Sequence, residues 1–171
     1  MLMAFWEVQR LTREINELER QAMETRIRLS HYQKYAGRLG GSSIMTMGNV
    51  AGLSAELVPR AAIFAQFSNQ ASSMSASQNL QMMKMNGLVP WLGNPYSQMQ
   101  YEMSAFNRFK EESLKALKEQ EVDVLNEKEK EIELELSSIE TRLKEKRAML
   151  DSTKGLLSEQ AKNSAPTFGL R

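Results

Sequence analysis

Residues 1–41 read MLMAFWEVQRLTREINELERQAMETRIRLSHYQKYAGRLGG. From Val8 to Leu39, positions spaced alternately three and four residues apart are apolar, with Thr25 as the one polar member. An average spacing of about 3.5 residues predicts an α-helix with one seam that packs on a partner helix in a coiled coil. Glycines that begin at Gly37 predict the end of this helix. The seam residues of this segment include Val8, Leu11, Ile15, Leu18, Leu29 and Tyr32.

Residues 97–162 predict a second and longer helix. The segment contains no proline, and Gly155 is its only glycine. At ~1.5 Å per residue, this helix would be ~100 Å long and the first helix ~60 Å. The seam of the longer helix therefore extends past its partner, and the excess must pack on something else. The seam residues of this segment include Leu125, Ile132, Leu136, Ile139, Leu143 and Leu150.

The charges favour an antiparallel pairing of the two helices. In that direction the basic residues within 26–38 face the acidic run within 119–135. The acidic residues within 14–19 then face the basic residues within 142–147. Each exposed pair contributes less than ~1 kcal/mol, but several pairs together select orientation and register. We therefore predict an all-α fold built on a long antiparallel helical hairpin with coiled-coil arms, although the same seams could instead pair between chains.

The middle segment, residues 42–96, has very few charges. It holds only Glu56, Arg60 and Lys84, although the whole chain has 22 Lys and Arg and 21 Asp and Glu residues. The segment is rich in Met, Ser and Ala, and flexible thioether side chains suit adaptable binding surfaces. We expect a partner surface here; the alternative is an ordinary core beneath the long helix. The candidate surface residues are Met45, Met47, Phe64, Phe67, Met82, Met83, Met85 and Trp91.

Short helices and turns are expected within this middle segment. Residues 57–67 predict a helix with Pro59 in its first turn, where a missing N–H costs nothing. Residues 68–86 predict a weaker helix whose Met and Leu residues point outward. Residues 88–96, LVPWLGNPY, predict a turn-rich corner. With a flexible tail over 163–171, the chain is expected to form one structural domain.

Composition and motifs argue against an enzyme. The chain has no cysteine, and its single histidine, His31, has no second imidazole or thiol with which to share a metal ion. The acidic run within 119–135 is typical of a solvated helix flank. No catalytic triad, nucleotide-binding motif or base-stacking array is present, and a net charge of +1 is not that of a nucleic-acid binder. We therefore expect no catalytic residue, no metal, no cofactor and no nucleic-acid partner, and we expect Trp6 and Trp91 to act as anchors.

Neither a secretory signal nor a membrane span is predicted. The first residues are apolar but meet Glu7 and Arg10 almost at once, which does not match a signal peptide. No window approaches the ~18 apolar residues of a transmembrane helix, and we do not expect membrane contact. The default expectation is a cytoplasmic protein, and an export route without a cleaved signal stays open.

No residue motif places the chain in a family. In layout, charged helical ends around a Ser/Ala/Gln/Asn-rich, cysteine-free centre resemble subunits of type III secretion filaments, needle tips and flagellar axial proteins. In those families the terminal helices pair to form the wall or shaft of a polymer. We therefore expect a non-enzymatic structural protein that self-associates as a homo-oligomer or binds a helical protein partner. The alternatives are an export chaperone or adaptor that binds a client helix, and a membrane-active protein that uses residues 57–85.

Overall fold

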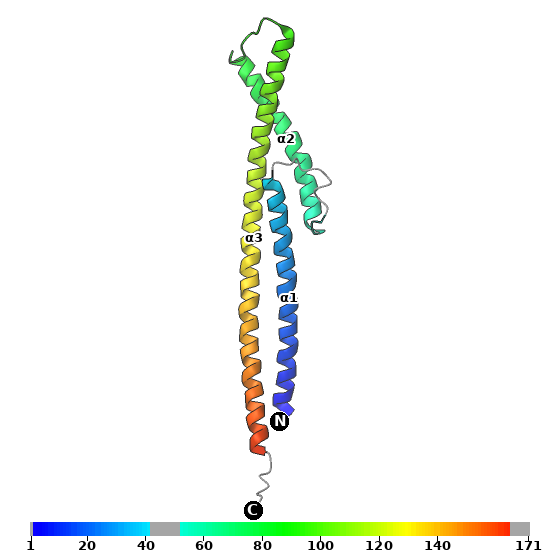
Figure 1. The fold of residues 1–171 in the computed structure, drawn as a ribbon, viewed down its shortest axis with the longest axis vertical. Helices are drawn as coiled ribbons and strands as arrows, with labels where there is room; N and C mark the ends of the chain where they lie inside the picture. Colours follow the sequence, from blue (N-terminus) through cyan, green and yellow to red (C-terminus); the bar gives the residue numbers. More distant parts are fainter. Residues whose placement is uncertain (1, 42–51, 165–171) are drawn as a thin grey trace, which may run out of the picture. The chain divides into compact units, whose positions relative to one another are not determined.

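The computed structural model describes residues 2–41 and 52–164, and these residues form three helices. Helix α1 spans Leu2–Gly40, α2 spans Leu57–Met85 and α3 spans Pro95–Ser164 (Figure 1). The described residues contain no strand, so the predicted all-α class is confirmed.

The ends of the helices follow from local sequence. α1 continues through Gly37 and ends within the predicted glycine cluster, at Gly40. At the start of α3, the side-chain Oδ1 of Asn94 accepts a hydrogen bond from the backbone N–H of Tyr96 at 2.9 Å, and Pro95 occupies the first helical position. Asn before Pro is a favoured way to begin a helix, because the side chain satisfies a free N–H and proline needs none. The turn-rich corner predicted before α3 is confirmed.

Helix α2 is a single element, whereas the sequence predicted two shorter helices over 57–67 and 68–86. The backbone N–H groups of Leu57 and Val58 donate to the carbonyl of Ser54 and begin the helix. At the other end, Gly87 has a φ of +65°, which ends the helix in a conformation that glycine adopts without strain. No glycine or helix-breaking proline lies between these ends, so nothing divides α2 in the middle.

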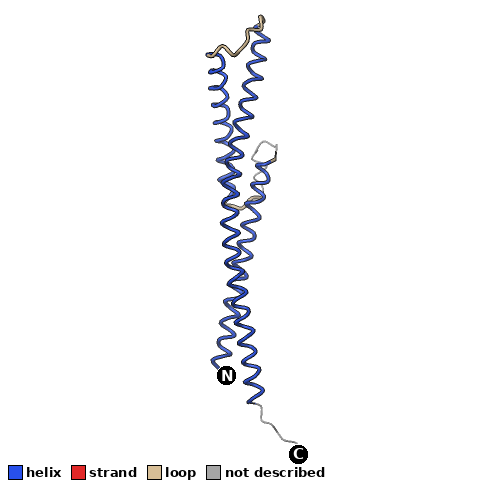
Figure 2. Tube along the Cα trace, turned by 90° about the vertical axis from the view of Figure 1, so that its left-hand side faces the viewer, coloured by secondary structure: helices blue, strands red, loops and turns tan. Residues whose placement is uncertain are grey.

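The chain divides into two compact units, which are described separately. The two-helix unit consists of Met1–Leu29 and Lys130–Arg171, and the three-helix unit consists of Ser30–Glu129. In the two-helix unit, α1 and α3 lie side by side in both views and run in opposite directions (Figure 1, Figure 2). Its core includes Leu18, Ala22 and Ile139, and the half-buried Leu136 and Leu143 pack against them.

Ion pairs across the two-helix unit agree with the predicted antiparallel register. Glu14 binds Lys146 at 2.7 Å and Glu19 binds Arg147 at 2.6 Å, as the charge pattern predicts. The predicted partners of the basic residues are found in part. Arg28 pairs with Glu135 of the acidic run, whereas Arg26 pairs at 2.6 Å with Glu140, just beyond it.

The three-helix unit explains what covers the excess length of α3. There α2 runs antiparallel to α3, because Arg60 near the start of α2 pairs with Glu121, whereas Lys84 near its end pairs with Glu102. The last turns of α1 contribute the buried Tyr35 and Leu39 to the same unit. The excess of α3 was expected to pack on something else, and the structure shows that α2 of the same chain covers it. None of the helices in the described ranges has an apolar stretch long enough to cross a membrane.

Replacing Leu18 by lysine tests the core of the two-helix unit. Leu18 is only 5% exposed, so we expect Leu18→Lys to lower the free energy of unfolding by about 2–5 kcal/mol, because it removes apolar contacts and buries an ammonium group. Leu134→Lys is the matched control, since Leu134 is 73% exposed on the same unit and should change stability by about 0.5 kcal/mol or less. Urea unfolding followed by circular dichroism measures both. Equal curves for the two variants would contradict the packing described here.

Candidate interaction site

Helix α2 buries small side chains and exposes large ones, which is the reverse of an ordinary amphipathic helix. Its fully buried positions after Leu57 are Ala61, Ser68, Ser72 and Ala76. Alanine and serine leave little side chain between helices, so they allow α2 to approach its neighbours closely. Leu57, at the start of the helix, is the one large apolar residue of α2 that is buried.

The opposite side of α2 carries a stripe of large apolar side chains. Five of them are between 58% and 79% exposed, and we call this set the outer stripe. At about 100° per residue, positions 63, 67, 74 and 85 fall within an arc of about 40°, so they line one side of the helix. The positions between them hold Gln70, Gln78 and Gln81, which are exposed and uncharged. The members of the outer stripe are Ile63, Phe67, Met74, Met82 and Met85.

The only two charged residues of α2 pair with α3 of the same chain. The Nε of Arg60 donates to Oε1 of Glu121 at 2.6 Å, and its Nη2 donates to Oε2 at 3.0 Å. The Nζ of Lys84 donates to Oε2 of Glu102 at 2.5 Å, and this bond holds the pKa of Glu102 below its ordinary value. These two ion pairs lie near opposite ends of α2. Together they show that α2 runs antiparallel to α3 along most of its length.

A tyrosine from each of two successive turns of α1 joins this polar network. The hydroxyl of Tyr35, whose side chain is fully buried, donates to Glu121 at 3.4 Å. The hydroxyl of Tyr32 donates to Glu56, just before α2, at 3.2 Å. Residues of all three helices therefore meet at Glu121, which accepts hydrogen bonds from both α1 and α2.

The protonation of this junction follows from burial and from the nearby charges. Burial raises the pKa of Tyr35 well above its ordinary value, and the carboxylate of Glu121 raises it further because it disfavours a second negative charge. The hydrogen bond from Arg60 to Glu121 likewise raises the pKa of Arg60. The junction therefore holds a neutral phenol beside a paired guanidinium and carboxylate.

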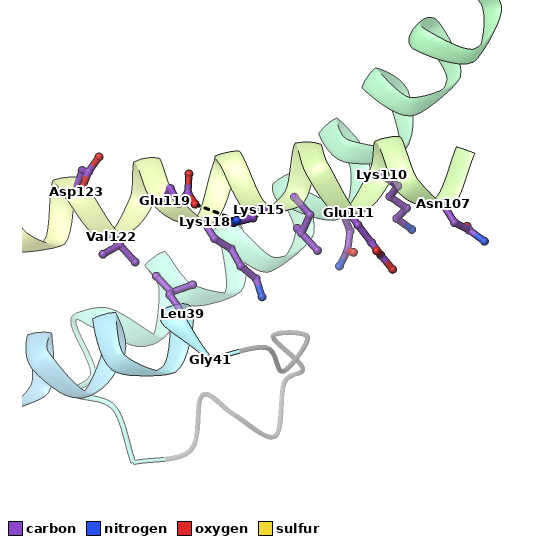
Figure 3. Close-up of a pocket in the computed structure, with 13 residues that line it drawn as sticks. Leu39, Gly41, Asn107, Lys110, Glu111, Lys115, Lys118, Glu119, Val122 and Asp123 are labelled. Atoms are coloured by element: carbon purple, nitrogen blue, oxygen red, sulfur yellow. Dashed lines mark ion pairs between the residues drawn. The ribbon is translucent and has the colours of Figure 1, made fainter. Parts of the chain in front are cut away.

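Where α1 ends, a groove of about 920 Å³ opens between the helices of the three-helix unit (Figure 3). Leu39 and the following glycines form its end, and one flank of α3 forms its wall. Three lysines and three acidic residues of α3 line it, and one such pair, Lys115 and Glu119, lies at 3.9 Å. Among the described lining residues none is Ser, Thr, Tyr, Cys or His, so they supply no hydroxyl, thiol or imidazole to act as a nucleophile or base.

Metal binding finds no support in residues 2–41 and 52–164, where no three His, Cys, Asp or Glu side chains are grouped as ligands. His31 is half-buried, and its Nδ1 has no hydrogen-bond partner. The tryptophans do not anchor the described chain, contrary to expectation. Trp6 and Trp91 are both mostly exposed, because neither lies on a face that another helix covers.

The structure places the predicted seam residues at buried or half-buried positions. On α1, Tyr32 is buried as expected, but so is Tyr35, which is not part of the seam. Tyr35 is buried because the three-helix unit covers a second side of α1. The buried seam residues are Leu11, Ile15, Leu18, Tyr32, Leu125, Ile132 and Ile139, and the half-buried ones are Val8, Leu29, Leu136, Leu143 and Leu150.

The candidate partner-surface residues fall into three groups. Phe67, Met82 and Met85 belong to the exposed outer stripe, and Trp91 is exposed in the connection between α2 and α3. Phe64 and Met83 are half-buried beside them. Met45 and Met47 lie outside the described residues.

Sequence reasoning missed one member of the outer stripe, Ile63, whereas Met74 lies in the segment whose Met residues were expected to point outward. Both lie in line with Met85, because intervals of eleven residues correspond to about three helical turns. This signal is present in the sequence, but it is visible only when residues 57–85 are taken as one helix.

Comparisons of the chain with protein-family models, with curated proteins and with solved structures find no significant match.

The junction at Glu121 can be tested with a pair of isosteric substitutions. Glu121→Gln removes the charge that Arg60 binds, and we expect it to lower the free energy of unfolding by about 1–3 kcal/mol. Glu119→Gln makes the same chemical change two residues away, at an exposed ion pair, and should cost less than about 1 kcal/mol. Urea unfolding of both variants gives the comparison. An equal loss of unfolding free energy in both variants would mean that the junction contributes no more to stability than an exposed ion pair does.

The buried phenol predicts a loss of stability at high pH. Because the pKa of Tyr35 is raised in the folded state, the unfolded chain loses this proton first, at about pH 10. Its contribution is therefore complete below pH 10, and above that the free energy of unfolding should fall by up to ~1.4 kcal/mol per pH unit. Tyr35→Phe lacks this proton, so its stability should decline less steeply above pH 10. Parallel stability curves for the two proteins would contradict the assignment.

Proposed function

We propose that this chain is a non-enzymatic structural protein that self-associates, and that the outer stripe of α2 is its assembly surface. The observation that carries the proposal is the reversed character of α2, whose buried positions after Leu57 are alanine and serine and whose large exposed side chains are Ile, Phe and Met. Large apolar side chains gathered on one exposed side of an element mark interaction sites. The stripe also lacks charge, which is the composition of an interface core.

The arrangement of the other apolar residues supports the same surface. The seam residues of the two-helix unit are covered within one chain, because Leu18 and Ala22 pack on Ile139. In the three-helix unit, α2 covers α3, so the seams offer no continuous apolar face to a second copy. Five of the 29 residues of α2 are large apolar side chains that are at least 58% exposed.

The absence of a cysteine and the groove lined by lysine, carboxylate and amide groups support the non-enzymatic part of the proposal. The described lining supplies no hydroxyl, thiol or imidazole, and its ion pair between Lys115 and Glu119 is exposed, whereas perturbed catalytic groups need burial. The charged residues that α2 does possess bind Glu102 and Glu121 of the same chain, which is a structural use.

Molar mass as a function of concentration tests the proposal. We expect light scattering coupled to size exclusion to show a mass above 19.5 kDa that rises over a hundredfold range of protein concentration. The triple variant Phe67→Gln, Met74→Gln, Met85→Gln should shift this association at least tenfold to higher concentration. Glutamine preserves helix propensity, so circular dichroism should stay unchanged.

A triple variant elsewhere provides the matched control. Leu134→Gln, Met149→Gln, Leu156→Gln removes equally exposed apolar side chains from the two-helix unit and should leave association unchanged. A constant monomer at every concentration would contradict self-association and would favour the adaptor alternative, in which the stripe binds a client helix. An equal effect of the two triple variants would show that α2 is not the assembly surface.

A further inference from the structure

The residues on the outer face of α2 show the same spacing whether they are counted from the start or from the end of the helix. One series of its exposed positions is separated by intervals of three and four residues that are symmetric about Met74. Ile63 lies eleven residues before Met74, and Met85 lies eleven residues after it. The exposed positions in this series are 63, 67, 70, 74, 78, 81 and 85.

We propose that the outer stripe of α2 pairs with the outer stripe of a second copy of this chain, antiparallel and about a two-fold axis at Met74. This inference rests on the proposed function and specifies its contact. In this arrangement Met74 meets Met74 of the second copy, and Ile63 meets Met85. A two-fold contact of this kind uses the same surface on both copies, and the symmetric spacing provides it.

The exposed area is sufficient for such a contact. At on the order of 200 Å² for a large side chain, the four exposed apolar residues in this series present about 500 Å² per copy. Two copies would bury about 1,000 Å² before any glutamine is counted, which is the smallest area expected of a specific interface. A second copy is therefore a partner of adequate size.

Polar residues also face polar residues at the centre of the antiparallel pair. Gln70 of one copy lies opposite Gln78 of the other, and each amide can donate to and accept from its counterpart. Phe67 lies opposite Gln81, so the bulkiest side chain meets a slender one rather than a second phenylalanine. The two helices therefore keep a similar separation along the contact, and none of the paired positions holds a charged residue.

The antiparallel direction of pairing follows from the helix dipoles and from the sizes of the side chains that face each other. A parallel pair would set Phe67 against Phe67 and align the two helix dipoles in the same direction. An antiparallel pair places the positive end of each dipole near the negative end of the other. Arg60 and Lys84 do not oppose this arrangement, because both bind glutamates of their own α3.

Cysteine cross-linking of the full chain tests the pairing, since the natural sequence contains no cysteine. Met74→Cys should form a disulfide-linked dimer under mild oxidation, because the residue faces its own copy. Ile63→Cys alone should not form a dimer, whereas an equal mixture of Ile63→Cys and Met85→Cys proteins should form the mixed dimer. Leu134→Cys, exposed on the two-helix unit, measures the rate of accidental collisions.

Each other result overturns a defined part of the inference. If the unmodified chain associates and Ile63→Cys links to itself as fast as Met74→Cys does, the pairing is parallel and the antiparallel contact is wrong. If the chain associates but Met74→Cys links no faster than Leu134→Cys, the contact lies outside the outer stripe. If the unmodified chain stays monomeric at all concentrations, the proposed function fails together with the inference.

Discussion

The ion pair between Arg60 and Glu121 joins α2 to α3 in the unit that carries the candidate interaction site. Helix α2 buries mainly alanine and serine, so it gains less from apolar burial than a helix with leucine on its inner face. The guanidinium of Arg60 binds the carboxylate of Glu121 through two hydrogen bonds, and such a bidentate pair fixes the relative orientation of the two groups as well as stabilising the contact. With Tyr35 packed against the same carboxylate, α2 is held with its small side chains inward, and its large apolar side chains face solvent.

Much of the fold could be predicted because the information is local. The three-four spacing of Leu11, Ile15 and Leu18 predicts a helix whatever its partner is, and the blocks of opposite charge predict its antiparallel neighbour. The burial of Tyr35 could not be predicted in the same way. It lies off the seam and becomes buried only because a third helix joins α1 and α3, which is a property of the assembled unit.

The candidate site was predicted less completely, because the sequence does not show which side of α2 packs against the other helices. Uncharged side chains surround most of this helix, so its composition does not distinguish an inner face from an outer one. Phe67, Met74 and Met85 were expected at a surface, whereas Ile63 was missed. Contacts with the other helices decide which side is covered, and contacts between distant segments cannot be derived from helical spacing alone.

Exposed methionines make the outer face of α2 chemically sensitive. Met74, Met82 and Met85 present thioether sulfurs to solvent, where peroxides can oxidise them to sulfoxides. A sulfoxide is polar and strongly hydrated, so oxidation would turn an apolar surface into a hydrophilic one without changing the backbone. Because the chain has no thiol that would react first, these sulfurs would be among its first oxidant targets. Methionine sulfoxide reductases reverse this reaction, so the surface could be restored after oxidative damage.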